Sequence, residues 1–166
     1  TKVTYHVKDW FSVTGSLHAD FYDRFKRHER IDKRQKDYES SIYQPRLTVT
    51  SNYFNGHSLI LGMEHTSDEL TSDRFSGNAN HDLKTRALKE TEYFLQDEWT
   101  INPRWMISVG IRTNFSKAFG FMGMPKVAAK YSPDKHWSLR ANYSMGYRSP
   151  SIKELFFNWD HLGMFM

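Results

Sequence analysis

The side chains that most often carry chemistry in proteins are sparse and scattered in this sequence. It has 166 residues and 8 histidines, and no two of the histidines stand at a metal-site spacing. It has no cysteine, so thiolate zinc sites and cysteine nucleophiles are excluded. There is no serine-hydrolase, phosphate-binding or dinucleotide-binding motif and no paired catalytic carboxylate. The sequence therefore predicts that the protein is not an enzyme.

Composition limits the elements that could position a site. The chain is 39% hydrophobic, 16% aromatic and 25% charged, with a mean hydropathy of -0.71 and a formal net charge of +4. No window approaches the roughly 18 uninterrupted apolar residues of a membrane-spanning helix. Its 12 Phe, 9 Tyr and 5 Trp are too much aromatic surface for a disordered chain. We expect one domain, without a signal peptide, whose two ends are cuts through a longer protein.

Alternation with a period of two is the dominant pattern. Residues 137–148 place apolar and aromatic side chains on one side and every charge on the other. Residues 105–115 and 11–21 repeat this arrangement, and weaker copies lie between these segments. Because successive side chains of a strand point to opposite faces, each segment predicts a strand with one apolar and one polar face. We expect about eight strands in the chain.

The predicted connections between strands alternate in length. Short turns are expected around Asp9, Gly56, Pro103 and Asp134, residue types that supply a positive φ, a fixed φ or an Asx turn. At the other end of the strands, longer polar links are expected over residues 27–39, 66–86 and 118–123, and after Ser149. Short turns at one end and long loops at the other predict an antiparallel up-and-down meander.

Strand length and aromatic placement indicate the fold class. The clearest repeats are about 11 residues long, against about 5–6 in an ordinary strand and about 9–11 in a tilted strand that crosses a bilayer. Aromatic residues stand at the ends of the apolar faces, as in belts at two lipid–water boundaries. A Lys or Arg at mid-depth on a lipid-facing strand costs about 2–4 kcal/mol, and these faces carry none. The sequence predicts an all-β segment of a transmembrane β-barrel, and a soluble β-rich binding module stays open as the alternative.

Two stretches carry a resemblance to a known family. Residues 94–99 read Phe-Leu-Gln-Asp-Glu-Trp, and residues 146–156 read Gly-Tyr-Arg-Ser-Pro-Ser-Ile-Lys-Glu-Leu-Phe. The second stretch resembles a signature of TonB-dependent outer-membrane receptors, and the similarity covers most of residues 90–157. The resemblance implies a bacterial outer-membrane barrel of about 22 strands, of which this chain would be about a third.

Membership in this family would imply active import. Such receptors take up scarce, bulky nutrients such as haem, ferric siderophores or cobalamin, driven by proton-motive force that the TonB complex delivers. They also have an N-terminal plug domain and a TonB-contacting segment, neither of which we find in residues 1–166. We therefore expect a partial receptor barrel whose partners are a small-molecule nutrient, outer-membrane lipid and the TonB complex. A surface lipoprotein is left open as a further partner.

The resemblance also suggests residues that bind the ligand. In haem-importing members, a box similar to residues 147–150 is followed by a loop histidine, which here is His161. By this likeness His161 is a candidate axial ligand of haem iron, with haem as cargo and no resident cofactor. The alternative is that His161 is an ordinary loop residue and that the box belongs to the general fold. The other candidate contacts are Tyr147, Arg148, Trp159 and the neighbouring aromatics Phe156 and Phe157.

A basic run completes the set of candidate partner sites. Seven of the thirteen residues from 24 to 36 are Lys or Arg. No aromatic-interleaved strand motif of the RNA-binding type accompanies the run, so a nucleic-acid partner is not expected. We expect the run to attract lipopolysaccharide phosphates or to be simply solvated. Its members are Arg24, Lys26, Arg27, Arg30, Lys33, Arg34 and Lys36.

Overall fold

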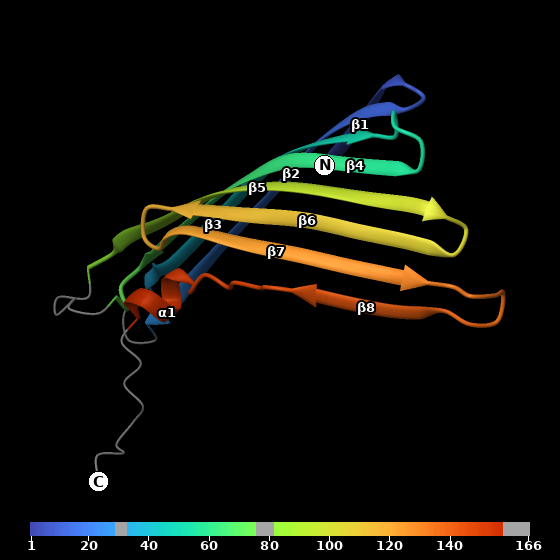
Figure 1. Ribbon diagram of the computed structural model, residues 1–166. Helices are drawn as coiled ribbons and strands as arrows, with labels where there is room; N and C mark the ends of the chain where they lie inside the picture. Colours follow the sequence, from blue (N-terminus) through green and yellow to red (C-terminus); the bar gives the residue numbers. More distant parts are fainter. Residues whose placement is uncertain (29–32, 76–81, 158–166) are drawn as a thin grey trace, which may run out of the picture.

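Eight β-strands form one continuous sheet in the computed structural model (Figure 1). The structure describes residues 1–28, 33–75 and 82–157, without the side chains of residues 26–28, 33–35 and 37. The strands follow one another in sequence order and each is antiparallel to the next, which confirms the all-β class and the meander. The strands are β1 (Lys2–Lys8), β2 (Phe11–His28), β3 (Lys33–Ser51), β4 (His57–Ser72), β5 (Lys84–Asn102), β6 (Trp105–Ser116), β7 (Gly120–Tyr131) and β8 (Leu139–Ser144), followed by the helix α1 (Ile152–Phe156).

Short turns join the strands at one end of the sheet, which we call the turn end. In the β5–β6 turn, Asn102 Oδ1 accepts hydrogen bonds from the backbone N–H groups of the two residues that follow Pro103, at 2.9 and 3.0 Å. In the β7–β8 turn, Asp134 Oδ1 accepts two such bonds at 2.7 and 3.0 Å. Gly56 adopts a φ of 78° in the β3–β4 turn, a conformation that favours glycine. The Asx and glycine turns predicted from the sequence are confirmed.

At the opposite end, which we call the loop end, the predicted long links are partly wrong. The β2–β3 and β4–β5 pairings continue through much of residues 27–39 and 66–86. The polar residues in these segments indicate exposure to water. Exposed strands and loops share this polar composition. The Thr71 and Thr85 hydroxyls, for example, bond across adjacent strands at 2.8 Å. Local polarity alone therefore did not separate strand from loop.

Two consequences of these pairings shape the loop end. At about 3.3 Å per residue, the 19-residue strands β3 and β5 are each about 60 Å long, about twice the thickness of a hydrocarbon core. They therefore project beyond a bilayer even when tilted. The predicted link over residues 118–123 is instead a tight hairpin between β6 and β7, with Gly120 at a φ of 78°. β5 consequently extends further than the β6–β7 hairpin beside it (Figure 1).

β8 is shorter than the strand predicted over residues 137–148. It pairs with β7 only over Leu139–Ser144. The next residue, Met145, still donates its N–H to the Pro125 carbonyl at 3.0 Å. Because proline has no N–H, Pro125 cannot return the second bond of that pair, and the ladder stops there.

The pairing register places the apolar side chains of the strands on one face of the sheet, which we call the apolar face. No other element in the described ranges covers this face, and Leu61, Leu95 and Ile111 remain 50%, 44% and 46% exposed. A soluble sandwich would bury such residues between two sheets, whereas the described residues form a single sheet. One row of this face holds Val13, Val49, Leu61, Leu95 and Ile111.

Aromatic side chains mark both ends of the apolar face. At the turn end, the Trp105 and Tyr131 rings stack with centroids 4.4 Å apart. At the loop end, the Phe115 and Phe121 rings lie 4.9 Å apart. Trp105 and Phe115 are the two ends of the same apolar face of β6. Two such belts are the expected anchors at the boundaries of a bilayer.

Asp97 of β5 is a carboxylate on the apolar face. Its Oδ2 lies 2.7 Å from Nδ1 of His57, whose ring stacks on Trp99 with centroids 5.2 Å apart. The pair therefore sits beside the turn-end aromatics. A charge near the interface costs about 0–1 kcal/mol, against about 2–4 kcal/mol for Lys or Arg at the midplane. Asp97 is thus compatible with a lipid-facing surface.

The opposite face, which we call the polar face, carries a small core at the loop end. Tyr38, Leu70, Phe75 and Ile152 are buried there, at exposures of 2–7%. Leu88, Phe156 and Phe157 pack around them, so this core attaches α1 to the sheet. α1 is five residues long, and no helix in the described part of the chain is long and apolar enough to cross a membrane.

Candidate ligand-binding site

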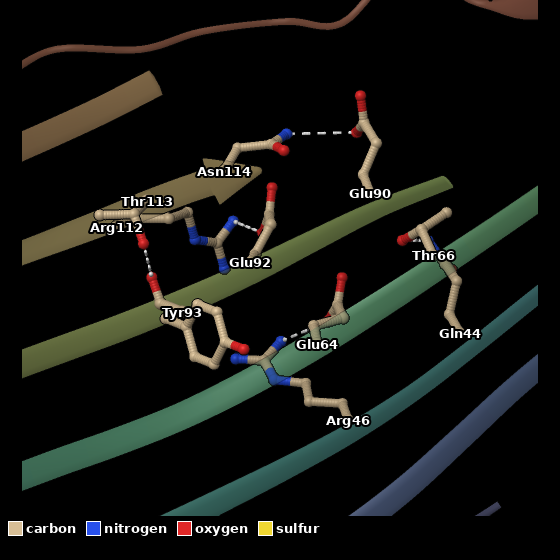
Figure 2. A network of polar contacts seen from close by, with 10 residues as sticks. All are labelled: Gln44, Arg46, Glu64, Thr66, Glu90, Glu92, Tyr93, Arg112, Thr113 and Asn114. Carbon is tan, nitrogen blue, oxygen red and sulfur yellow. Dashed lines mark hydrogen bonds and ion pairs between the residues drawn. The ribbon is translucent and has the colours of Figure 1, made fainter. Parts of the chain in front are cut away.

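Charged side chains of both signs line the middle of the polar face (Figure 2). Arg46 of β3 pairs with Glu64 of β4 at 3.5 Å, and Arg112 of β6 pairs with Glu92 of β5 at 3.3 Å. The register sets Arg46, Glu64 and Glu92 in one row across adjacent strands. Each arginine therefore has a carboxylate within reach without leaving the polar face.

Phe94 of β5 interacts with both arginines. Its ring centroid lies 4.7 Å from the guanidinium carbon of Arg46 and 5.6 Å from that of Arg112, within the cation–π range. Gly62 of β4 leaves room for the ring, because a Cβ at this position would overlap both Phe94 and the Leu47 carbonyl oxygen. We call Arg46, Phe94 and Arg112 the arginine–phenylalanine cluster.

A hollow of about 470 Å³ opens beside this cluster. Its lining combines the arginine–phenylalanine cluster with Lys126 of β7 and with Tyr147. Lys126 Nζ donates to the Gln96 amide oxygen at 2.5 Å, and no carboxylate of the described residues forms an ion pair with it. The hollow therefore has an excess of positive charge next to two aromatic rings. Such a lining suits an anionic molecule with conjugated parts.

The structure gives different positions to the two described candidates of the 147–150 box. Tyr147 lines the hollow, as a ligand contact would. Arg148 instead forms an ion pair with Glu154 of α1 at 2.8 Å, and its side chain is 79% exposed. The carboxylate that Arg148 binds thus belongs to α1, and the ion pair connects α1 to the segment that follows β8.

Glu154 is also the centre of a capping box. Its carboxylate accepts bonds from the Ser151 N–H and hydroxyl at 2.7 and 2.9 Å, and its own N–H donates to the Ser151 hydroxyl at 3.3 Å. These bonds from Ser151, followed by the bond from Arg148, lower the pKa of the Glu154 carboxyl below its usual value. Part of the stretch that carries the family resemblance, Ser151 to Glu154, therefore caps the N-terminus of α1.

The remaining candidates divide into two groups. His161 and Trp159 lie outside the described residues, so their roles stay predictions. Phe156 and Phe157 pack against Phe75, with ring centroids 6.4 and 5.4 Å apart. Their rings serve the small core that holds α1. Within residues 1–28, 33–75 and 82–157, no three His, Asp or Glu side chains form a group that could hold a metal ion.

The arginine–phenylalanine cluster and Lys126 were not among the ligand contacts predicted from the sequence. Alternation placed Arg112 and Lys126 on a polar face, but it could not show that β3, β5 and β6 bring Arg46, Phe94 and Arg112 together. That depends on pairing across four strands. Gly62 was the available signal, since a glycine inside a long strand often marks a close approach by a neighbour.

A single sheet with one lipid-compatible face and one charged, polar face defines a segment of a transmembrane β-barrel. The chain matches the family described as TonB dependent receptor-like, beta-barrel over residues 2–165, and it belongs to that family. The resemblance and the outer-membrane location are thereby confirmed. The family's proteins are receptors that transport and not enzymes.

Two curated relatives share the name iron-regulated outer membrane virulence protein. They come from Vibrio cholerae serotype O1, one from a classical Ogawa strain and one from an El Tor Inaba strain. Each is 24% identical to this chain over an alignment of 160 residues, and the alignment covers 93% of this chain and 22% of the relative. The chain thus spans about a fifth of the length of these relatives.

Proposed function

We propose that this chain is part of an outer-membrane active transporter that imports a bulky iron complex with energy delivered by the TonB complex. Family membership supports the transport class, and the name of the two relatives, which marks those proteins as iron-regulated, supports iron. The observation that carries the proposal is the cationic and aromatic hollow on the polar face, because it lies where a barrel would enclose its ligand path.

The chemistry of the hollow favours an anionic iron complex. Haem and ferric catecholate siderophores both present acidic oxygens beside conjugated rings, which match the Lys126 ammonium and the Phe94 and Tyr147 rings. Cobalamin is the alternative cargo within the same family. It contains cobalt rather than iron, so iron-regulated relatives argue for the iron complex.

Individual residues have distinct roles in this proposal. Tyr147 contacts the ligand, and Arg148 acts indirectly by holding α1 through Glu154. If the cargo is haem, His161 is its axial ligand and Trp159 stacks on the macrocycle. Residues 1–166 supply barrel wall, about eight of about 22 strands. In this proposal the plug domain and the segment that contacts TonB belong to other parts of the receptor.

Uptake by the full-length receptor tests the proposal. The receptor is expressed in cells without other iron receptors, and uptake of a ferric siderophore, haem or cyanocobalamin is measured with and without TonB. We expect TonB-dependent uptake of an iron complex. Uptake that persists without TonB, or uptake of cyanocobalamin alone, would contradict the proposal.

A matched pair of substitutions tests the hollow itself. Lys126→Gln removes the unpaired charge in the hollow, whereas Lys130→Gln removes a charge from the same face of β7 outside it. We expect Lys126→Gln to weaken binding of the transported complex and Lys130→Gln to leave binding unchanged. Equal effects of the two substitutions would show that the hollow does not bind the transported complex.

Haem as cargo has its own spectroscopic test. Full-length receptor is titrated with haem while the Soret band is followed. If His161 is the axial ligand, His161→Ala shifts the band and weakens haem binding. An unchanged spectrum and affinity would remove His161 from the site.

A further inference from the structure

A second hollow lies at the loop end, where β5 extends beyond the β6–β7 hairpin (Figure 1). It has a volume of about 700 Å³, and we call it the hairpin notch. Apolar atoms make up most of its lining. The side chains that matter here are His65 and Lys89 on one side and Phe115, Lys117 and Phe121 on the other.

Two lysines meet at the hairpin notch. Glu90 and Ser116 are the last pair of the β5–β6 register. Lys89 and Lys117 are the residues next to this pair, and both line the hairpin notch. Both are exposed, and neither forms an ion pair with a carboxylate of the described residues. Glu69 is an acidic residue on the same face of the sheet. It stands opposite Ala87, whereas the residue opposite Lys89 is Ser67. Like charges that line one hollow repel each other, and an anion bound between them relieves the repulsion.

The aromatic residues of the hairpin notch indicate its depth in the membrane. Phe115 and Phe121 belong to the loop-end belt, and Phe115 also contacts the Tyr93 ring at 6.0 Å. An aromatic belt marks the depth at which acyl chains give way to headgroups. Bacterial barrels have their short turns on the periplasmic side, so the loop end lies at the outer leaflet. There the two lysines stand at headgroup level and line an apolar hollow that can take an acyl chain. His65 faces the same hollow, and its Nδ1 bonds to the Thr91 hydroxyl at 2.9 Å.

The basic run that the sequence offered as an anion site is less suitable. Lys36 is held between Asp23 at 3.0 Å and Glu39 at 2.9 Å, and these bonds raise the pKa of its ammonium. Arg24 packs over the Tyr38 ring at 5.3 Å. These two charges are engaged within the protein, whereas the charges of Lys89 and Lys117 are not engaged by any described acid.

We propose that the hairpin notch is a binding site for a phosphorylated glycolipid of the outer leaflet, in which Lys89 and Lys117 bind a phosphate of lipid A and the apolar lining holds an acyl chain. Lysine is a point-charge partner for phosphate, and a paired arrangement can contact one phosphate from two sides. The site faces lipid and not the barrel interior, so it does not depend on which nutrient is transported.

The test uses purified full-length receptor in detergent and a fluorescent lipid A that retains its phosphates. We expect Lys89→Gln with Lys117→Gln to bind this probe about tenfold more weakly than the wild type, since each cation at a lipid surface contributes to binding. Lys89→Arg with Lys117→Arg keeps both charges and should keep most of the affinity. Lys130→Gln with Lys135→Gln removes the same charge at the turn end and should change little.

Two further measurements keep the result unambiguous. Dephosphorylated lipid A should bind the wild type as weakly as phosphorylated lipid A binds the double glutamine variant. Resistance of the barrel to unfolding in sodium dodecyl sulfate confirms that each variant is folded. Equal binding of the two lipids by the wild type, or equal losses in the loop-end and turn-end double variants, would overturn the proposal. Competition by inorganic phosphate as effective as that by lipid A would also overturn it, because the acyl chain would then contribute nothing.

Discussion

Ile111 and Arg112 are neighbours in β6, yet they lie on faces with opposite requirements. Ile111 is one of a row of exposed aliphatic side chains with no protein layer over them. Arg112 stands among charges and is paired with Glu92 and with the Phe94 ring. The apolar face needs the absence of charge, whereas the polar face needs a partner for each charge. One strand can meet both demands only because its side chains alternate.

The same contrast separates the polar face from the hairpin notch. Arg46 and Arg112 have carboxylate partners on adjacent strands of the sheet, which neutralise their charges. Lys89 and Lys117 have none among the described residues, and they lie at the lipid boundary. Charges that serve structure are neutralised internally, whereas charges left without an internal partner are available to a ligand.

The largest expected effect comes from placing a charge on the apolar face. Ile111→Arg should destabilise the full-length barrel in lipid vesicles by about 2–4 kcal/mol, because the guanidinium would lie in hydrocarbon near mid-depth. Ser108→Arg on the polar face of the same strand is the matched control, since it lies opposite Glu98. Urea unfolding in vesicles gives both free energies. Equal destabilisation by the two substitutions would mean that the two faces do not have different solvents.

A smaller effect should follow from filling the space under Phe94. Gly62→Ala adds a Cβ that overlaps the Phe94 ring and the Leu47 carbonyl, so the ring must move away from the arginines. We expect a loss of about 1–3 kcal/mol in the free energy of unfolding, the usual range for overpacking. Gly15→Ala on β2 is the control, because nothing lies within 4 Å of its added Cβ. If the two alanine variants unfold at the same urea concentration, Gly62 is not required for this packing.

Removal of a single ion pair should cost less. Arg112→Ala leaves Glu92 beside Glu64 without its partner. The arginine is 44% exposed, so we expect only about 0.5–1 kcal/mol in the free energy of unfolding. High salt should reduce the difference, and Arg112→Lys should recover part of it. A salt-independent loss would show that packing on Phe94, and not the ion pair, is the main contribution of Arg112.

The smallest effect concerns the anchoring of α1 and depends on pH. Since the pKa of Glu154 is lowered in the folded protein, its bonds to Ser151 and Arg148 stabilise α1 fully above the unperturbed pKa of 4.5. The stabilisation is lost as the pH falls through the lowered pKa. Amide hydrogen exchange of residues 152–157, corrected for intrinsic rates, should therefore rise at acidic pH in the wild type. Glu154→Gln should remove this pH dependence, and a pH dependence unchanged by the substitution would assign it to another group.

Most of the barrel architecture could be predicted from the sequence because the information is local. Alternation in residues 105–115 requires only that neighbouring side chains face different solvents, and Asn102 and Asp134 encode their turns within three residues. Strand ends could not be read in this way. The end of β8 depends on Pro125, which lies on another strand. In the extended loop-end strands, polar residues occur on both faces and apolar residues such as Leu70 and Leu88 lie on the otherwise polar face, so the alternation that marks a strand is weak there.

The candidate site was predictable only in part. Tyr147 was found through the family resemblance and lines the hollow, but the same resemblance gave Arg148 a ligand role while the structure pairs it with Glu154. The arginine–phenylalanine cluster could not be found, because its members are 18 or more positions apart and meet only through the register of β3 to β6. Sequence patterns identify the face on which a residue lies, and strand pairing identifies its neighbours.

The central claim is that one face of the sheet meets lipid and the other meets water. Single spin labels along β6 test it directly, and the 166 residues contain no cysteine that would interfere with labelling. In full-length receptor reconstituted in vesicles, labels at positions 107, 109 and 111 should be more accessible to oxygen, and labels at 108, 110 and 112 more accessible to a water-soluble nickel complex. Accessibility that does not alternate along β6, or that alternates in the opposite sense, would contradict the account.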